Sequence, residues 1–467
     1  MKRSHDLVQA HRGHRVTAIL GIVPVILLVL SGCGAAAPDA TERSAAPVAT
    51  SPGATTAAAD DARRVDLAQP TFSDPTAVTN PLFPIKKLTQ MVQIGAEAGH
   101  PLRHDITLLP QTKTIEWNGH EVENLVSQFI AYQDGRLLEV AYDYFAQADD
   151  GSVWYFGEDV FNYKDGVIDN TDGTWLAGRD GPPGMIMPAD PEVGDIYRPE
   201  NIPELVFEEV TVKAVDQTVT GPSGPVPGGI LVQERLLDGV LEDKKFAPGY
   251  GEFEASVPSE DELATAAVAV PTDARSDAAA DQLADLSAHA DRAFDAAAAA
   301  SQADLAESAT AAVETWRDYP GADAPSILAT QLSDAVEALA TAVDSDEPGS
   351  AQQAALALAT ASLDLRSLSE PVPVVDLARL EVWARQLVLD AGAAGAAPVH
   401  GADGFVLGDL AVIEAIWERA APPADIETAT EVSSAIAGVQ AAVDVSDLDS
   451  AAAAARQLSV SLRARAG

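Results

Sequence analysis

The sequence predicts a multidomain α+β protein, in which an antiparallel curved β-sheet or open barrel precedes an all-α domain of two duplicated four-helix units. Three observations predict this arrangement. Residues 70–257 hold 19 of the 25 aromatic residues and are rich in valine and isoleucine, which favours strands. Residues 258–467 contain no lysine and are rich in alanine, leucine and acidic residues, which favours helices. Within this second part, two similar segments recur about 100 residues apart.

Residues 1–32 have the pattern of a lipoprotein signal peptide. Basic residues precede a 15-residue apolar run, Val16 to Leu30, which is shorter than the roughly 20 residues of a spanning helix. The run ends in Leu30-Ser31-Gly32-Cys33, which resembles the bacterial lipobox, and Cys33 is the only cysteine. We expect Cys33 to carry a lipid that anchors the exported protein at the outer face of the cytoplasmic membrane.

Residues 33–69 are mainly alanine, proline, threonine, serine and aspartate. Such a stretch buries too little apolar surface to fold, so we interpret it as a disordered tether. A β domain at 70–257 and an all-α domain at 258–467 would follow. The change in composition between them, close to Pro258 and Pro271, predicts a boundary between domains that fold independently.

The β domain contains strong turn signals. Asn118-Gly119 is typical of a tight hairpin, because both residues tolerate a positive φ angle. Asp-Gly pairs repeat this device, and strand-like runs lie between the pairs. The pairs are at 134–135, 150–151, 165–166 and 238–239, and the runs are 123–132, 136–146, 153–163 and 230–237. A loop rich in glycine and proline, 178–198, is expected to interrupt this meander.

Four segments of the β domain carry a resemblance to a known family. They are Thr79–Pro84 (TNPLFP), Val153–Asp159 (VWYFGED), Met185–Pro191 (MIMPADP, followed by Gly194-Asp195) and Phe246–Gly251 (FAPGYG). Together they resemble exported actinobacterial proteins of unknown function, over about residues 75–255. The resemblance implies an envelope location and supplies no activity.

The helical part contains an internal repeat. Residues 332–363 align with 432–463 without a gap, and both have the pattern helix, Asp-rich loop, serine N-cap, helix. The matched pairs include Ser333/Ser433, Val343/Val443, Ser350/Ser450 and Leu358/Leu458. The alternative is chance similarity between alanine-rich helices. A true repeat predicts two four-helix units, near 273–366 and 374–465.

The same alignment matches aromatic residues. Trp316 and Trp417 fall at nearly equivalent positions, and we expect both to be packed. Residues 280–294 align with 374–388, which sets His289 against Trp383. Because His289 lies at the edge of an apolar stripe, we expect this position to face the bundle in both units.

The charge of the chain limits its partners. With 29 basic and 71 acidic residues, the formal net charge is −42. Nucleic acid is therefore not an expected partner, because binding it requires clustered lysine and arginine. No nucleophile elbow, phosphate loop, HExxH motif or dinucleotide fingerprint occurs, so no enzyme class and no cofactor is indicated.

Two small groups of residues are weak metal-site candidates. Met185 and Met187 could offer thioether sulfurs to Cu(I), although packing of apolar side chains against the sheet is the favoured explanation. His100 and His104 share one face of a strand and could hold zinc or copper. A further stripe in the helical part, Asp277, Asp281, Asp285 and His289, is better explained as a solvated helix face.

Two other residue sets bear on function. Tyr142, Tyr144, Trp154 and Phe156 could line an apolar ligand cavity inside the curved sheet, or could fill a closed core. Asp376/Arg379 and Glu381/Arg385 have the spacing of intrahelical ion pairs. We expect these two pairs to be exposed, and the alternative is a buried polar site.

These observations favour a lipid-anchored cell-envelope protein with a non-catalytic binding or interaction role. Its expected partners are the membrane, through Cys33, and an envelope protein or a lipophilic ligand. Two alternatives remain open, a carrier of a lipophilic molecule in the β domain and an envelope metal-handling protein.

Overall fold

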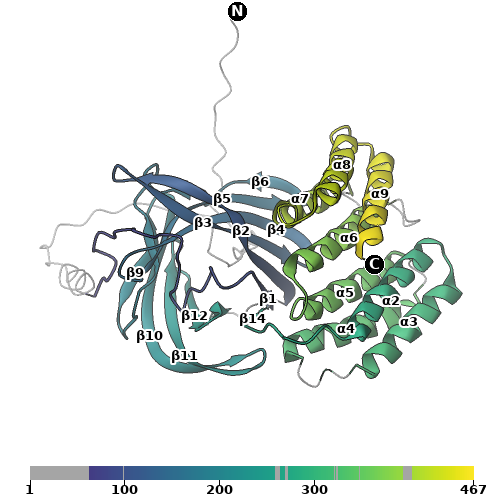
Figure 1. Ribbon diagram of the computed structural model, residues 1–467, viewed down its shortest axis with the longest axis horizontal. Helices are drawn as coiled ribbons and strands as arrows, with labels where there is room; N and C mark the ends of the chain where they lie inside the picture. Colours follow the sequence, from purple (N-terminus) through teal and green to yellow (C-terminus); the bar gives the residue numbers. More distant parts are fainter. Residues whose placement is uncertain are drawn as a thin grey trace, which may run out of the picture.

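The computed structural model describes residues 63–97, 99–257, 263–268, 272–319, 321, 324–345, 348–392 and 402–466. Within these residues antiparallel strands come first and helices follow, which confirms the predicted α+β class (Figure 1). The predicted signal peptide, Cys33 and most of the predicted tether lie outside them. Among the described helices, none is long and apolar enough to cross a membrane.

The described strands form one antiparallel sheet of 14 members. They are β1 (Gln90–Glu97), β2 (His100–Trp117), β3 (His120–Gln133), β4 (Arg136–Gln147), β5 (Val153–Lys164), β6 (Val167–Asn170), β7 (Trp175–Leu176), β8 (Gly184–Met187), β9 (Ile196–Ile202), β10 (Val206–Gly221), β11 (Gly224–Leu236), β12 (Leu241–Ala247), β13 (Gly251–Ser256) and β14 (Leu263–Val268). The main path of the sheet is β6-β5-β4-β3-β2-β1-β14-β13-β12-β11-β10-β9, and β7 and β8 pair with β5.

The sheet curls so strongly that its two ends meet (Figure 1). Strand β8 pairs with β5 near one end and lies against β9 at the other. A Cβ atom on Gly184 of β8 would lie 1.8 Å from the carbonyl oxygen of Pro199 in β9, so only glycine permits this approach. One apolar cluster joins opposite walls of the curled sheet, for example Phe145 of β4 and Val232 of β11. We call the enclosed space the sheet interior.

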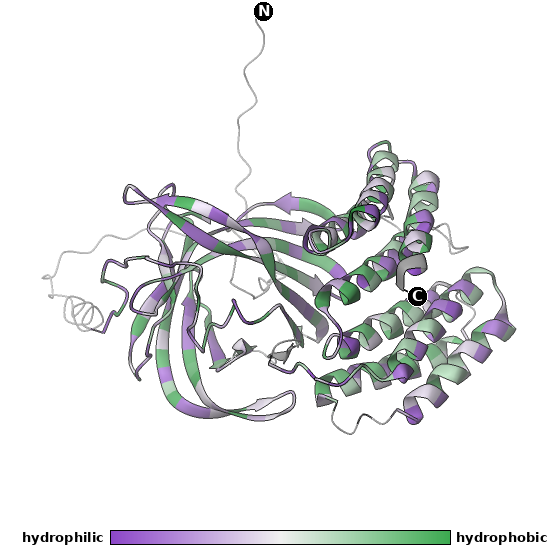
Figure 2. Cartoon of the chain, viewed as in Figure 1, coloured by the Kyte–Doolittle hydropathy of each residue, from purple (hydrophilic) through white to green (hydrophobic). Residues whose placement is uncertain are grey.

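The turn signals of the sequence are confirmed. Asn118 and Gly119, with φ angles of 52° and 77°, connect β2 to β3. The Asp-Gly pairs connect β3 to β4, β4 to β5, β5 to β6 and β11 to β12. Figure 2 shows hydrophobic and hydrophilic residues alternating along several strands, as expected when one face of a strand is buried.

Two expectations about the β domain are wrong in detail. The predicted loop 178–198 contains β8 and the start of β9, because Met185 and its neighbours extend the sheet beside β5. The sheet also continues past the expected boundary at residue 257. Strand β14 lies within the predicted all-α part and pairs with both β1 and β13, so the chain returns to the middle of the sheet before the first helix.

The all-α part consists, in the described residues, of eight helices in two units. They are α2 (Asp281–Ala298), α3 (Gln302–Arg317), α4 (Ser326–Ala342), α5 (Pro348–Arg366), α6 (Val372–Asp390), α7 (Ala402–Ala420), α8 (Ile426–Val443) and α9 (Leu448–Ala466). In the first unit α2 packs against α3 and α5, and α4 packs against α5. In the second unit α6 packs against α7 and α9, and α8 packs against α9. The two units therefore share one arrangement.

A pair of equivalent hydrogen bonds supports the duplication. The indole Nε1 of Trp316 donates to Ser333 Oγ at 3.0 Å, and that of Trp417 donates to Ser433 Oγ at 3.0 Å. Each bond connects the second helix of its unit to the third, α3 to α4 in the first unit and α7 to α8 in the second. The predicted equivalence of the two tryptophans is confirmed.

Two finer expectations about the repeat are wrong. The Asp447 side chain, rather than Ser450, caps α9, because its Oδ1 accepts a hydrogen bond from the Ser450 backbone N at 3.0 Å. The matched His289 and Trp383 also face different neighbours. His289 Nε2 lies 3.1 Å from Thr315 Oγ1 inside the first unit, whereas Trp383 stacks on Tyr132 of the sheet.

The second helical unit docks on the outside of the sheet, whereas the first lies beside it (Figure 1). Helix α7 contacts β2, β4 and β6. One apolar cluster combines Ile130 and Val140 of the sheet with side chains such as Leu380 of α6 and Ile413 of α7. The first unit reaches the sheet near β1, where Ile94 packs against its core. The two predicted domains therefore share a buried interface.

Candidate functional site

The helix pairs expected at the surface are buried, which corrects the sequence-based expectation. Asp376 is 0% exposed and Arg379 is 4% exposed, and Glu381 and Arg385 are buried as well. Side-chain spacing on a helix identifies an ion pair but does not indicate whether that face meets solvent or another element. Here the faces that carry the pairs are covered, that of Asp376 and Arg379 by β1 of the sheet and by α7.

Asp376 and Arg379 belong to a buried ion-pair network between sheet and helices. Its members, which we call the interdomain network, are Arg103, Asp105, Asp364, Asp376, Arg379 and Arg419. Arg419 holds Asp376 with two hydrogen bonds of 2.8 and 3.0 Å. Arg103 of β2 holds Asp364 of α5 in the same manner, at 2.6 and 2.9 Å. Three arginines and three aspartates make the network formally neutral, as a buried ion cluster requires.

Amide side chains of the sheet complete the interdomain network. Arg419 Nη1 donates to Gln128 Oε1 at 3.1 Å, and Gln128 Nε2 donates to the Ala415 carbonyl at 2.9 Å. Arg379 Nη1 donates to Gln90 Oε1. Burial alone would raise the pKa of Asp364, but the neighbouring Arg103 and Arg379 hold it below its usual range. Asp364 therefore stays ionised at neutral pH.

A cleft of about 500 Å³ opens over the interdomain network, between β1–β3 and α4–α6. We call it the interdomain cleft. Tyr132 and Trp383 form one wall, with ring centroids 5.5 Å apart and planes 20° from parallel. Arg379, Trp383 and Gln386 follow each other at i, i+4 and i+7 on α6, so they line the cleft from one helix face. Tyr132 stands opposite Arg103 in the register of β3 and β2.

Polar atoms without hydrogen-bond partners remain in the interdomain cleft. They are Tyr132 Oη, Arg379 Nε and Gln331 Oε1, and each is buried. Gln331 Nε2 donates to Asp364, and the Gln331 carbonyl oxygen is buried without a partner. Buried polar atoms in proteins are almost always satisfied, so three such atoms on residues that line one cleft set this cleft apart from an ordinary packed interface.

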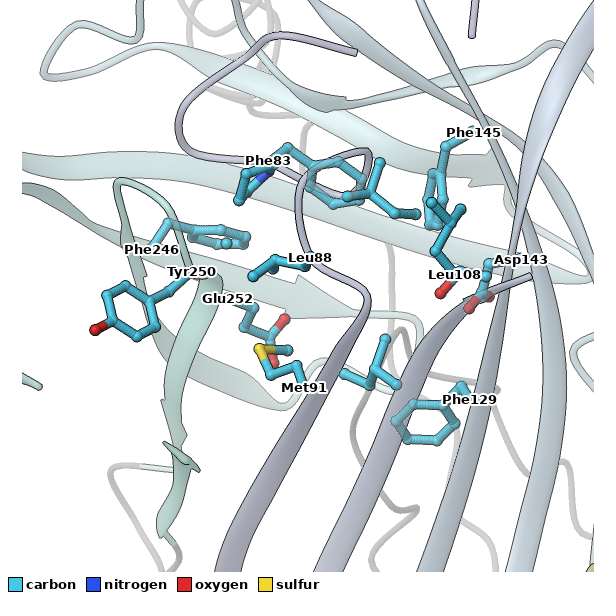
Figure 3. A pocket seen from close by; sticks show the side chains of 15 residues that line it. Phe83, Leu88, Met91, Leu108, Phe129, Asp143, Phe145, Phe246, Tyr250 and Glu252 are labelled. Atoms are coloured by element: carbon cyan, nitrogen blue, oxygen red, sulfur yellow. The ribbon is translucent and has the colours of Figure 1, made fainter. Parts of the chain in front are cut away.

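A second cavity, of about 90 Å³, lies in the sheet interior (Figure 3). We call it the interior cavity. Most of its lining is apolar and comes from β1–β4 and from the segment Phe83–Leu88 that crosses the mouth of the sheet. Asp143 and Glu252 supply its carboxyl groups. Asp143 Oδ1 accepts a hydrogen bond from Tyr155 Oη at 2.8 Å, and Glu252 lies 3.6 Å from Lys244 Nζ.

Further carboxyl groups are buried in the sheet interior around this cavity. We call the following set the interior carboxyls: Glu139, Asp143, Glu158, Glu200, Glu208, Glu234, Glu242 and Glu252. Burial raises the pKa of Asp143 to about 7 and that of Glu139 to about 8. Burial, and then neighbouring carboxyls, raise the pKa of Glu208 well above its usual range. Lys244 is the cation among them and pairs with Glu234.

Three of the four aromatic residues proposed as a cavity lining fill the core instead, and the fourth faces the helices. Tyr144, Trp154 and Phe156 are 3%, 4% and 0% exposed and belong to the main apolar cluster of the sheet. Tyr142 points to the helices, where its hydroxyl donates to Glu418 Oε2 at 2.8 Å. None of the four lines the interior cavity. The side chains of β4 that line the interior cavity are those of the neighbouring residues Asp143 and Phe145.

The proposed metal ligands do not converge. Met185 and Met187 are buried in the apolar cluster beside β5. His100 is exposed, with Nδ1 2.8 Å from Asp134 Oδ2. His104 is buried, its Nδ1 lies 2.9 Å from Gln93 Oε1, and burial lowers its pKa to about 4. In the part of the chain that the structure describes, no three His, Cys, Asp or Glu side chains form a group able to hold a metal ion.

The residues of the interdomain cleft were not identified from the sequence. A partial signal was present, because Arg379, Trp383 and Gln386 have helical spacing on one segment. Their partners Arg103 and Tyr132 lie about 250 residues away and depend on how the two parts dock, which periodicity does not predict.

Comparisons with protein families, with curated proteins and with solved structures found no match. The resemblance to exported actinobacterial proteins therefore remains a prediction, and the function is argued from the two cavities alone.

Proposed function

We propose that this protein is a lipid-anchored envelope protein that binds a polar ligand in the interdomain cleft without transforming it. The observation that carries the proposal is the set of orphan polar atoms beside the stacked Tyr132 and Trp383. The cleft volume of about 500 Å³ lies within the range of roughly 300–1,000 Å³ that is usual for small-molecule sites, and such sites are common between domains.

The chemistry of the cleft favours an uncharged ligand with hydroxyl or amide groups beside a flat apolar face. The interdomain network is neutral, so it attracts neither cations nor anions strongly. Gln331, Gln353 and Gln386 offer both donors and acceptors. The Trp383 ring supplies a flat apolar surface. An N-acetylated oligosaccharide combines these properties and suits an envelope location.

A binding role is supported over a catalytic one by the state of the cleft carboxylates. Asp105 and Asp364 accept hydrogen bonds from Arg103, and such ion pairing makes an aspartate a poor general base. The sequence also lacks the recognised catalytic motifs.

A direct test is to titrate the protein with N-acetylglucosamine oligomers and to measure binding by isothermal titration calorimetry. Trp383→Leu and Gln386→Leu should each weaken binding at least tenfold. Trp316→Phe, on α3 and outside the cleft lining, is the matched control and should bind as the parent does. An affinity that is unchanged in Trp383→Leu, or no binding of these oligomers to the parent, would count against the proposal.

The lipid anchor needs its own test. Cys33→Ala should move the protein from the membrane fraction to the soluble fraction of the producing cells and remove the lipid from its intact mass. Retention of the variant in the detergent phase would contradict the lipobox interpretation.

The carrier alternative has less support than the binding role. The interior cavity of about 90 Å³ is smaller than a usual ligand site, and its apolar contents are mostly filled by core side chains. A whole lipid would have to displace the segment Phe83–Leu88. The metal-handling alternative has no cluster of ligands in its favour within the described residues.

A further inference from the structure

The hairpin of β10 and β11 extends beyond the strands on either side of it (Figure 1). Strand β10 pairs with β9 as far as Thr211, and β11 pairs with β12 from Ile230 onward. Between these two positions, within the described residues, β10 and β11 pair with each other alone, up to the tip where Gly221 lies opposite Gly224. We call residues 213–228 the hairpin extension.

Both strands of the hairpin extension are irregular where it leaves the sheet. The register of β10 against β11 shifts three times over residues 212–219, and Asp216 has a positive φ angle of 53°. On β11, Gly228 has a φ angle of 78°. Bulges of this kind bend a strand and interrupt its ladder of hydrogen bonds. The two irregular segments lie opposite each other, since Gln217 pairs with Gly229, and together they form a hinge.

Few buried side chains hold the hairpin extension in place. Val219 is the one buried residue among 213–228, all of which the structure describes, and it is 4% exposed. Val226, which pairs with Val219 across the hairpin, is partly buried against the same apolar cluster. At the tip, Ser223 lies next to the Asp273 side chain. Segments with few buried apolar side chains open locally at a lower free energy than the rest of a fold.

The hairpin extension packs on residues that line the interior cavity. Val219 belongs to one apolar cluster with Leu88, Met91 and Tyr250, and these three residues also line the cavity (Figure 3). The lining includes no residue of the extension, so the extension rests on this wall from outside. The Tyr250 hydroxyl donates to Asp273 Oδ1 at 2.8 Å, and Asp273 therefore lies between the cavity wall and the tip of the extension.

We propose that the hairpin extension is a lid that swings about its two irregular segments and controls access to the interior cavity. The structure shows the closed form, in which Val219 packs with Leu88 and Met91. In the open form this wall of the cavity meets solvent. A hairpin that only lengthened the sheet would need neither a hinge in both strands nor an apolar side chain turned onto the cavity wall. The lid is separate from the interdomain cleft and does not depend on the function proposed there.

Two methionines of nearly equal exposure allow a sharp test. Met91 is 5% exposed in the cluster beneath the lid, and Met185 is 4% exposed in the packed cluster at β8. Dilute hydrogen peroxide transfers one oxygen atom to an accessible thioether sulfur and leaves water, and peptide mass spectrometry measures the sulfoxide formed at each methionine. Because lid opening exposes only the first site, Met91 should be oxidised at least tenfold faster than Met185. Equal rates in the parent protein would contradict the proposal.

Variants separate lid opening from general loosening of the fold. Val219→Ser and the milder Val219→Ala weaken the closed lid, and each should raise the oxidation rate of Met91 at least threefold while that of Met185 stays the same. Thr220→Ser, at an exposed position of the lid, is the matched control and should change neither rate. An unchanged Met91 rate in both Val219 variants, or a rise shared equally by Met185, would show that the extension is a fixed part of the sheet and would overturn the proposal.

Discussion

The interdomain network and the sheet interior bury the same kinds of charged groups in opposite ways. The network balances three arginines against three aspartates, so its carboxylates remain ionised. The sheet interior holds eight buried carboxyls, of which four lie near Lys244, and burial raises the pKa of several of the eight toward or above neutrality. Buried charge is neutralised by pairing in one region and by protons in the other. The two regions should therefore respond differently to mutation and to pH.

The largest expected effect is on the network. Replacing Arg419 by methionine leaves Asp376 buried without its two-point partner, which should cost about 3–5 kcal/mol of unfolding free energy. Urea unfolding measures this loss. Arg317→Met, which removes an exposed arginine paired with Asp318, is the control and should not change the unfolding midpoint.

A double variant tests whether the loss comes from the orphaned charge. Arg419→Met combined with Asp376→Leu removes both members of the pair and should recover part of the stability lost in the single variant. A double variant less stable than Arg419→Met would mean that shape rather than charge dominates at this position.

These residues also mark the limit of what sequence could predict. The Asn118-Gly119 and Asp-Gly turns and the helical repeat follow from local rules, and all are present in the structure. Asp376 and Arg379, however, have the same spacing that exposed ion pairs have. Their burial depends on Gln90 and Arg103, more than 260 residues away, whose approach is set by the docking of α6 and α7 on the sheet. Local patterns contain no information about that approach.

The sheet interior should give the next effect, through pH. The folded pKa of Asp143 is about 7, against 3.8 for the ordinary group, and that of Glu139 is about 8, against 4.5. The folded state therefore holds protons that the unfolded state has lost. Stability should fall as the pH rises from about 4 to about 8 and then level off.

Asp143→Asn isolates one of these protons. Between pH 4 and 8 the unfolding free energy of the variant should fall by about 2–4 kcal/mol less than that of the parent, because asparagine does not ionise. Urea unfolding at a series of pH values provides the measurement. Asp364→Asn should not flatten the profile in this range, since Arg103 and Arg379 hold the pKa of Asp364 low. A parent profile that is flat from pH 4 to 8 would contradict the protonated interior.

The smallest effect compares the two helical units, which share a tryptophan–serine hydrogen bond but differ in exposure. Ser433→Ala leaves the Trp417 indole N–H without its acceptor, and because Trp417 is only 9% exposed, water replaces that acceptor poorly. The expected loss is about 1 kcal/mol of unfolding free energy. Ser333→Ala should cost less, because Trp316 is only partly buried and its N–H can turn to solvent. The indole N–H signals in a ¹H–¹⁵N spectrum should shift one at a time, Trp417 in the first variant and Trp316 in the second. Ser276→Ala, an exposed serine ahead of α2, should move neither signal. Equal losses in the two units would show that the repeat has kept its energetics as well as its geometry, and that exposure does not weaken this bond.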